Sequence, residues 1–325
     1  MLTRFHKFAL GLLAVQLVLA VVMLRTPDDA AAAKDKPLLP GFDVAKVTRV
    51  VVSSSQSTAP IDLVKRDGGW VLASHFDYPV DATKITDLLG PLAKMAAAAP
   101  IATSPNRHKQ LRVANDDHER RLIVTIDGKE QTILLGGSAG ARRTAVRLGN
   151  EERVFAVRGI SAYSAGTEPR QWIDASYVKV PRDEISAITV QRGASTVELA
   201  RASTSAPWTA SLDGAPVAPA AGESLDATAI DNLVTAASTI ELAAPGDPKR
   251  DVATPTATIT IARTSTTATS PAPVVIDVLL DGDRYWVRQR GADRAGLVDK
   301  HRLEPLLGVT RDKLVQSRPQ TPPKG

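Results

Sequence analysis

The chain has 325 residues, of which 43% are hydrophobic and 4% are aromatic, and it contains no cysteine. This apolar content is sufficient for packed cores, so the composition excludes a largely disordered chain, and the length allows two domains. The 40 basic and 35 acidic residues give a formal net charge of +5, but they are spread along the chain without the concentrated basic stripe and interleaved aromatic residues typical of nucleic-acid binding.

A long apolar run near the N-terminus predicts a membrane anchor. From Phe8 to Leu24 the only strongly polar residue is Gln16; Arg4 and Lys7 precede the run and Arg25 follows it. As a helix these 17 residues span about 26 Å, close to the roughly 30 Å hydrocarbon core of a bilayer. We therefore expect a single-pass anchor in the inner (cytoplasmic) membrane, with the bulk of the chain exported to the periplasm.

The alternative interpretation of this segment is a cleaved signal peptide. The small residues at 30–33 could supply a cleavage site. However, the apolar run is slightly long for a signal peptide and Arg25 interrupts the approach to that site, which favours an uncleaved anchor. Residues 26–39, rich in alanine with alternating lysine and aspartate, predict a solvated tether.

The next part of the chain predicts an antiparallel meander with one helix. Runs rich in β-branched residues, joined by turns such as those at 67–69, 127–128 and 149–150, indicate hairpins. Asp81 is a suitable N-cap for a helix whose apolar residues follow at helical spacing, and Pro91 is expected to bend or weaken that helix. Strands are predicted at 48–53, 61–65, 70–73, 121–126, 131–135, 145–148 and 154–157, and a short helical turn at 159–166.

The second half of the chain repeats the first. Residues 81–88, DATKITDL, return as DATAIDNL at 226–233, and Trp70 has a counterpart in Trp208. A duplication on this scale predicts two similar domains. In the second half, strands are predicted at 185–191, 197–201, 208–212, 256–262, 274–280 and 285–288, and a helix at 226–237.

The predicted fold class is therefore α+β. An N-terminal transmembrane helix is followed by two duplicated modules, each consisting of an antiparallel β-meander plus a short helix. The proline-rich C-terminus predicts a disordered tail. The predicted boundaries are 1–25 for the anchor or signal peptide, 26–39 for the tether, 40–182 and 183–316 for the two modules, and 317–325 for the tail.

One literal match to a catalytic motif occurs, Gly-x-Ser-x-Gly at 136–140, centred on Ser138. A nucleophile elbow needs a strand before the serine and a helix after it, whereas charged and β-like residues follow here. We expect this motif to link two strands, which leaves a serine hydrolase as a weak alternative. His108 and His118 lack the spacing of a zinc site, so no catalytic, metal or cofactor residue is predicted.

The densest positive charge lies in the first module. On neighbouring strands it could form a basic face for an anionic partner, such as lipid headgroups, a cell-wall polymer or an acidic protein surface. The solvated face of an antiparallel sheet has the same appearance in sequence. The residues are Arg107, His108, Lys109, Arg112, Arg120, Arg121, Arg142 and Arg143.

Several motifs of the first module together resemble a bacterial family. They are LLPGFD at 38–43, LVK at 63–65, GGWVL at 68–72, YPVDA at 78–82, and ATSP at 102–105 with His108. Over residues 38–180, and more loosely beyond, the chain is similar to the domain of unknown function 4340 family. In the second module Pro207 and Trp208 replace Gly-Gly-Trp. The family has no assigned catalytic residues, so none is carried over.

The resemblance implies a membrane-anchored extracytoplasmic protein, and some family members resemble auxiliary parts of ABC-type transport or gliding-motility systems. We therefore expect a non-catalytic accessory or scaffold subunit of such a membrane complex, with a permease and an ATPase as partners. Exposed sheet edges and polar faces would make the contacts. The alternative is a periplasmic module that binds an anionic polymer or lipid headgroups through the basic residues.

Overall fold

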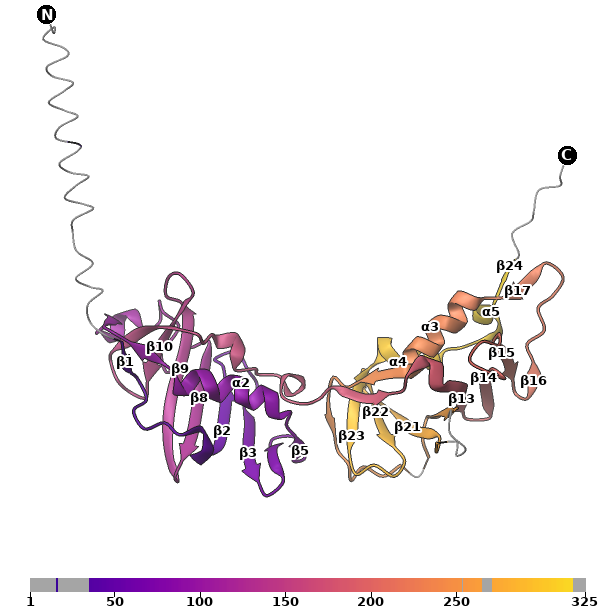
Figure 1. Ribbon diagram of the computed structural model, residues 1–325, viewed down its shortest axis with the longest axis horizontal. Helices are drawn as coiled ribbons and strands as arrows, with labels where there is room; N and C mark the ends of the chain where they lie inside the picture. Colours follow the sequence, from indigo (N-terminus) through magenta and orange to yellow (C-terminus); the bar gives the residue numbers. More distant parts are fainter. Residues whose placement is uncertain (1–15, 17–34, 253, 265–270, 318–325) are drawn as a thin grey trace, which may run out of the picture. The chain divides into compact units, whose positions relative to one another are not determined.

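The computed structural model describes residue 16 and residues 35–252, 254–264 and 271–317. These residues form mainly β-structure with a few helices, and two nine-stranded antiparallel sheets contain most of the strands (Figure 1). The predicted antiparallel α+β class is therefore confirmed. The predicted anchor lies outside the described residues except for Gln16, and no helix in the described part of the chain is long and apolar enough to cross a membrane.

The first sheet and its connections correspond to the first predicted module, and β1 adds a short strand within the predicted tether 26–39. Every long strand predicted there is present within three residues of its expected bounds. The elements are β1 (Lys36–Pro37), η2 (Val44–Lys46), β2 (Val47–Ser53), β3 (Ile61–Arg66), β4 (Gly69–Leu72), β5 (Tyr78–Pro79), α2 (Ala82–Ala93), β6 (Ala96–Ala97), β7 (Pro100–Ala102), η3 (Pro105–Arg107), β8 (Arg120–Ile126), β9 (Lys129–Ser138), β10 (Arg143–Leu148), β11 (Val154–Arg158), η4 (Ala162–Ser164) and η5 (Pro169–Gln171). The strands of two or three residues were not predicted, because so short a run carries no periodicity.

The remaining elements belong to the second sheet and its connections, and they begin with β12 and η6, ahead of the boundary predicted at 183. They are β12 (Ser176–Lys179), η6 (Arg182–Glu184), β13 (Ile185–Arg192), β14 (Ser195–Ala200), β15 (Thr209–Leu212), β16 (Ala215–Pro216), β17 (Glu223–Leu225), α3 (Ala227–Ser238), β18 (Thr239–Glu241), β19 (Ala244–Gly246), β20 (Ala257–Arg263), β21 (Val274–Asp281), β22 (Arg284–Gln289), β23 (Ala295–Asp299), α4 (Lys300–Leu307), α5 (Arg311–Leu314) and β24 (Val315–Ser317). Strands β12 and β23 and helices α4 and α5 were not predicted. Ser317 ends β24, so the predicted tail begins one residue too early, and its remainder lies outside the described residues.

The two sheets have the same strand order. The first runs β5-β4-β3-β2-β8-β9-β10-β11-β7 and the second β16-β15-β14-β13-β20-β21-β22-β23-β19. Each strand of one sheet therefore has a counterpart at the same position of the other. The counterparts also occur in the same order along the chain. We refer to the two sheets with their connections as the first copy and the second copy.

The main helix has the same place and the same cap in both copies. The carboxylate of Asp81 accepts a hydrogen bond from the backbone N–H of Thr83 at 2.9 Å, and that of Asp226 accepts from Thr228 and Ala229 at 2.9 and 3.0 Å. Helix α2 continues past Pro91 to Ala93. Their buried apolar residues follow helical spacing: Ile85, Leu88, Leu89 and Leu92 in α2, and Ile230, Leu233, Val234 and Ala237 in α3.

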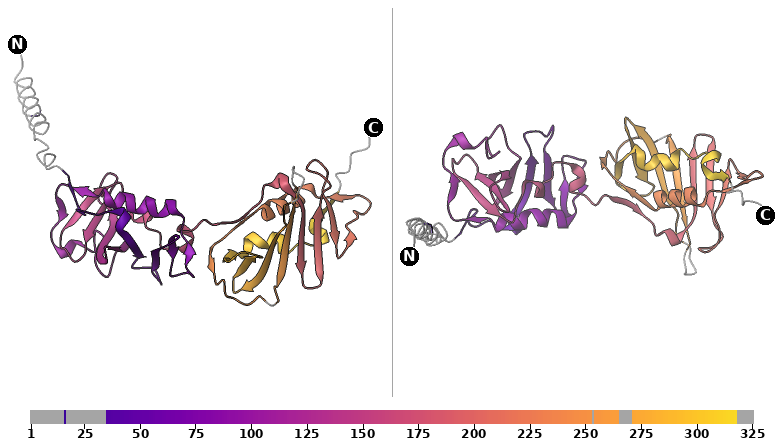
Figure 2. Two further views of the ribbon diagram at one scale, coloured as in Figure 1. Left: turned by 60° about the horizontal axis from the view of Figure 1, so that its bottom comes forward. Right: turned by 90° about the horizontal axis from the view of Figure 1, so that it is seen from above.

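The second copy carries additional helices after its last long strand. Helix α4 contacts α3, β13, β22 and β23, and Figure 2 shows α3 and α4 lying across the second sheet. In the first copy the corresponding segment forms only the short η4 and η5. Leu303, Leu306 and Leu307 are the residues that α4 buries, at the spacing of one helical face.

A proline lies in the strand at each outer edge of the two sheets. Pro79 in β5 and Pro100 in β7 bound the first sheet, and Pro216 in β16 and Pro245 in β19 bound the second. These edge strands are also only two or three residues long. Proline cannot donate a ladder hydrogen bond, so the edges are poor templates for another strand. The prolines therefore argue against the partner contacts expected at exposed sheet edges and leave the sheet faces and the loops as candidate contact surfaces.

Candidate anion-binding cluster

The connection between β7 and β8, residues 103–119, carries four of the predicted basic residues. Its backbone folds back on itself through an isolated bridge between Val113 and His118. Val113 is fully buried in a cluster with Ala102, Leu134, Ala145 and Val154. The segment 103–119 is therefore a packed layer over one face of the sheet, and its side chains have defined positions.

Both histidines of this segment have structural roles. His108 is 8% exposed and its Nε2 lies 2.9 Å from the carbonyl oxygen of Glu152, which requires that nitrogen to donate. His118 is 6% exposed and its Nδ1 lies 3.1 Å from the carbonyl oxygen of Ala114. Each imidazole thus ties the segment to itself or to the turn after β10, which is the ordinary environment of a buried histidine.

Two of the predicted cations are neutralised by carboxylates. Lys109 Nζ lies 2.9 Å from Asp116, and Arg112 Nε lies 2.6 Å from Glu119. The hydrogen bond and then the charge of Asp116 raise the pKa of Lys109, and the same hydrogen bond lowers the pKa of Asp116. These side chains contribute little net positive potential to an anionic partner.

Arg120 also uses its guanidinium inside the fold, as does an arginine that the sequence analysis did not single out. Arg120 donates to the carbonyl oxygens of Ala165 and Glu119 at 2.7 and 2.6 Å. Arg147, only 2% exposed, donates to the carbonyl oxygen of Val113 at 2.7 Å, to those of the turn after β10, and to the side chain of Asn115. Burial, and then the charge of Arg121, lowers the pKa of Arg147.

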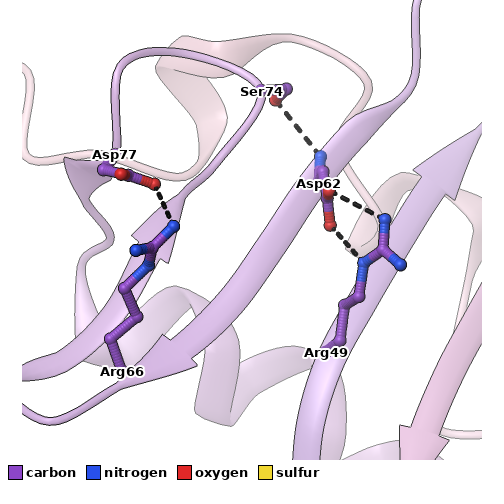
Figure 3. Close-up of polar contacts among 5 residues, drawn as sticks. All are labelled: Arg49, Asp62, Arg66, Ser74 and Asp77. Carbon is purple, nitrogen blue, oxygen red and sulfur yellow. Dashed lines mark hydrogen bonds and ion pairs between the residues drawn. The ribbon is translucent and has the colours of Figure 1, made fainter.

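Arginines at the other end of the first sheet are also paired with acids. Figure 3 shows Arg49 on β2 donating two hydrogen bonds to Asp62 on β3, at 2.8 and 2.9 Å. In the same view Arg66 donates to Asp77 at 2.8 Å, and the backbone N–H of Asp62 donates to Ser74. Arg49 and Arg66 are thus paired with carboxylates, as Arg112 is.

Three predicted cations lack such a partner. In the described part of the chain, no carboxylate lies within 4.0 Å of a side-chain nitrogen of Arg121, Arg142 or Arg143. Among the described residues, the guanidinium of Arg107 makes only a long contact, 3.5 Å, with the carbonyl oxygen of Ile101. The eight predicted residues therefore do not act as one basic face, because their charges are distributed among structural bonds, ion pairs and a few free guanidinium groups.

The structure places Arg143 in a cleft with two basic residues that the sequence analysis missed. Arg143 lies directly opposite Arg158 in the β10–β11 ladder. Both line a cleft of about 460 Å³, and Lys94, from the turn after α2, lines it as well. Counting the register outward from the predicted turn at 149–150 would place Ala156, and not Arg158, opposite Arg143, because the observed connection is longer than two residues. Nothing in the sequence places Lys94 beside them.

The remainder of the cleft is formed by small or apolar residues and one acid, Asp35. The three cations and Asp35 are all exposed to solvent. The carboxylate of Asp35 forms no ion pair within 4.0 Å with any described residue. The other lining residues are Ala96, Ala97, Ala98, Ala99, Ile101 and Ala156.

The Gly-x-Ser-x-Gly motif links two antiparallel strands, as predicted. Ser138 is the last residue of β9 and pairs with Thr144 of β10, so no helix follows the serine. A Cβ atom at Gly136 would lie 2.1 Å from the carbonyl oxygen of Leu111, in the segment 103–119. Gly136 is therefore explained by close backbone packing, and the motif here lacks the geometry of a nucleophile elbow.

Comparison with known proteins identifies the family and gives no further match. The family model described as "Domain of unknown function (DUF4340)" matches residues 70–255. No curated protein and no solved structure matches the chain. The matched range covers more than half of the chain and extends further into the second copy than the motifs that suggested the resemblance. The chain therefore belongs to the DUF4340 family.

Proposed function

We propose that this protein is a non-catalytic, membrane-anchored envelope protein that serves as an accessory or scaffold subunit of an ABC-type transport or gliding-like membrane complex. The observation that supports it best is the repetition of one nine-stranded order with proline at all four outer edges. Such sheets resist strand addition, so they offer partners two similar, preformed surfaces of faces and loops.

One loop of the first copy is a suitable contact point. Tyr163, in η4, is 87% exposed, the most exposed of the large apolar or aromatic side chains in the described chain. Tyrosine is enriched among the residues that dominate protein–protein binding energies, because it buries a large area at a low cost in conformational entropy. Its position on a short 3-10 turn would present it without rearrangement of the sheet.

The test is a mild-detergent pull-down of the full-length protein from native membranes, followed by mass spectrometry of its partners and of its own N-terminus. The proposal predicts co-purification of a permease and an ATPase with a chain that retains Met1–Leu24. It also predicts that Tyr163→Ser weakens the recovery of partners more than Leu280→Ser, a control at another exposed apolar side chain.

A soluble protein that starts near Ala33 and purifies without partners would contradict this proposal. A chain that keeps its N-terminus but recovers only unrelated abundant proteins would contradict it as well. An unchanged pull-down with Tyr163→Ser would instead leave the complex in place and exclude the η4 turn as its contact.

A further inference from the structure

We infer that the cleft formed by Lys94, Arg143 and Arg158 binds a phosphate group. This inference goes beyond the proposed scaffold role and does not depend on it. The first observation is an imbalance of charge: three cations line the cleft, and only Asp35 opposes them. No ion pair within 4.0 Å joins any of these four side chains to a described residue.

The pair Arg143 and Arg158 is unfavourable by itself. Residues directly opposite in an antiparallel ladder have closely spaced Cβ atoms, and like charges at such positions destabilise the sheet. Lys94 adds a third positive charge at the same cleft. A bound dianion would convert this repulsion into attraction, since each guanidinium can donate two hydrogen bonds to one phosphate.

The second copy shows how the same ladder position is occupied when no anion is required. There Arg284, the counterpart of Arg143, lies opposite Asp299, the counterpart of Arg158. Arg284 Nε is 3.2 Å from Asp299 Oδ1. Both β10 and β22 begin with arginine. The residue opposite is Arg158 in the first copy and Asp299 in the second. The positive charge of Arg143 and Arg158 is therefore available to a bound anion.

The same comparison explains why the cleft has room. Ala145 and Ala156 of the first copy correspond in register to Trp286 and Leu297 of the second. Trp286 is 1% exposed and fills the second copy at this level. In the first copy the small side chains of Ala156 and of the alanine run 96–99 line the open cleft, whose volume of about 460 Å³ accommodates a phosphate with an organic substituent.

The ligand class that fits is a phosphate monoester or diester. Its source is either a lipid headgroup or a soluble phosphorylated compound. Asp35 lies 11 residues after Leu24, the end of the predicted anchor, a length of chain that can span at most about 40 Å. A headgroup of the same membrane is thus within reach of the cleft, and we choose probes that separate the two sources.

The experiment is isothermal titration calorimetry on the full-length protein in detergent with three soluble probes: inorganic phosphate, glycerol phosphate, and dihexanoyl phosphatidylglycerol below its micelle concentration. Saturable binding of at least one probe is expected. Arg158→Asp should weaken that binding by about tenfold or more, because it replaces a cationic donor with a carboxylate that repels the phosphate. Asp35→Asn should strengthen it severalfold.

The control is Arg121→Asp, which makes the same change in charge at an exposed arginine outside the cleft and should alter affinity by less than about twofold at moderate salt. Arg158→Asp also recreates the Arg284–Asp299 arrangement, so the variant should keep or increase its melting temperature, and loss of binding cannot then be attributed to misfolding. If Arg158→Asp folds poorly, Arg143→Gln and Lys94→Gln test the same site, and each is expected to weaken binding severalfold.

Binding of the lipid probe alone, or at least tenfold more tightly than glycerol phosphate, would support a headgroup site. Similar binding of glycerol phosphate and the lipid would support a soluble phosphorylated ligand. No saturable binding by the wild type in the millimolar range, or equal losses in Arg158→Asp and Arg121→Asp, would overturn the inference. The pull-down of partners by Arg158→Asp reports on the scaffold proposal separately, since it should be unchanged.

Discussion

The hairpins β10–β11 and β22–β23 occupy the same place in the two copies and differ in what fills them. Their ladders have the same register, from Arg143 opposite Arg158 in one and from Arg284 opposite Asp299 in the other. The second hairpin is closed by an ion pair and by Trp286, whereas the first leaves an open cleft with unpaired cations. A duplicated backbone therefore leaves local chemistry free to differ between copies.

A second difference lies in the connection from the edge strand, β7 or β19, to the central strand that follows it in the chain, β8 or β20. The first copy uses residues 103–119 between β7 and β8, and the second uses only 247–256 between β19 and β20. Leu135 and Val278 hold equivalent register positions. The first ladder then shifts register, so Gly136 and Gly137 together occupy the place that Leu279 has in the second. The glycine at 136 allows the longer connection to pack against β9, because a Cβ atom there would lie 2.1 Å from the carbonyl oxygen of Leu111.

The largest expected loss of stability comes from removing the buried Trp286 side chain from the hairpin β22–β23. Trp286→Ala gives the second copy an alanine at the level where the first copy has Ala145, and it also removes the hydrogen bond from Nε1 to the carbonyl oxygen of Asp247. We expect a loss of about 3–5 kcal/mol in the free energy of unfolding. Urea unfolding followed by far-UV circular dichroism measures it. The half-buried Trp208, covered by Arg201, is the control, and Trp208→Ala should cost no more than about 2 kcal/mol.

The buried arginine of the first hairpin should contribute nearly as much. Arg147→Met keeps most of the side-chain volume but leaves the carbonyl oxygens of Val113 and Gly149 without their donors, and we expect a loss of about 2–3 kcal/mol. In the second copy Arg288, half-buried with one 3.4 Å contact to a carbonyl oxygen, is the counterpart. Arg288→Met should cost below about 1 kcal/mol. Equal shifts of the urea midpoint would refute a special role for Arg147.

The glycine motif provides a third comparison. Gly136→Ala places a Cβ against the backbone of Leu111, so we expect about 1–3 kcal/mol of destabilisation and faster amide exchange in the segment 103–119. A Cβ atom at Gly137 would meet no described residue within 4 Å apart from its chain neighbours, so Gly137→Ala should be close to neutral. Ser138→Ala should have no effect on stability. Labelling of Ser138 by a fluorophosphonate would show that the motif is catalytic after all.

The smallest effects concern the helix caps, which the two copies share. Asp81→Ala and Asp226→Ala should each cost about 1 kcal/mol, since each removes the acceptor for first-turn N–H groups. Similar losses for the two variants would confirm equivalent helices, whereas a loss in only one would show that the copies cap their helices differently.

Asp81 also predicts a dependence on pH. Hydrogen bonds from Thr83, first from its side chain and then from its backbone, lower the pKa of Asp81 below its usual value of 3.8. The stabilising contribution of the carboxylate is therefore present above pH 3.8 and is lost as the pH falls through the folded-state pKa. Asp81→Asn keeps an acceptor without this titration, so its stability should fall less steeply in acid than that of the wild type.

Much of the fold could be predicted from the sequence because the long strands and main helices have recognisable local residue patterns. Alternating β-branched residues and Gly-containing turns located the long strands, and the recurrence of DAT before an apolar helical pattern located both main helices. The short edge strands and α4 were missed. A strand of two residues exists only because a neighbour supplies its hydrogen bonds, and α4 contains Pro305 within a polar sequence whose buried leucines become evident only against β22 and β23.

The candidate site depended far more on tertiary structure. The sequence by itself determined the duplication, the family, the position of the basic residues and the absence of a helix after Ser138. Only the folded chain decided which cations remain free, because pairing depends on distances of a few ångströms between residues far apart in sequence. Arg143 and Arg158 meet through the register of a hairpin, Lys94 joins them through the end of α2, and the Arg284–Asp299 pair shows that the same register can equally hold an ion pair. Coulomb energies fall with distance and side-chain packing is not periodic in sequence, so these choices are made only in three dimensions.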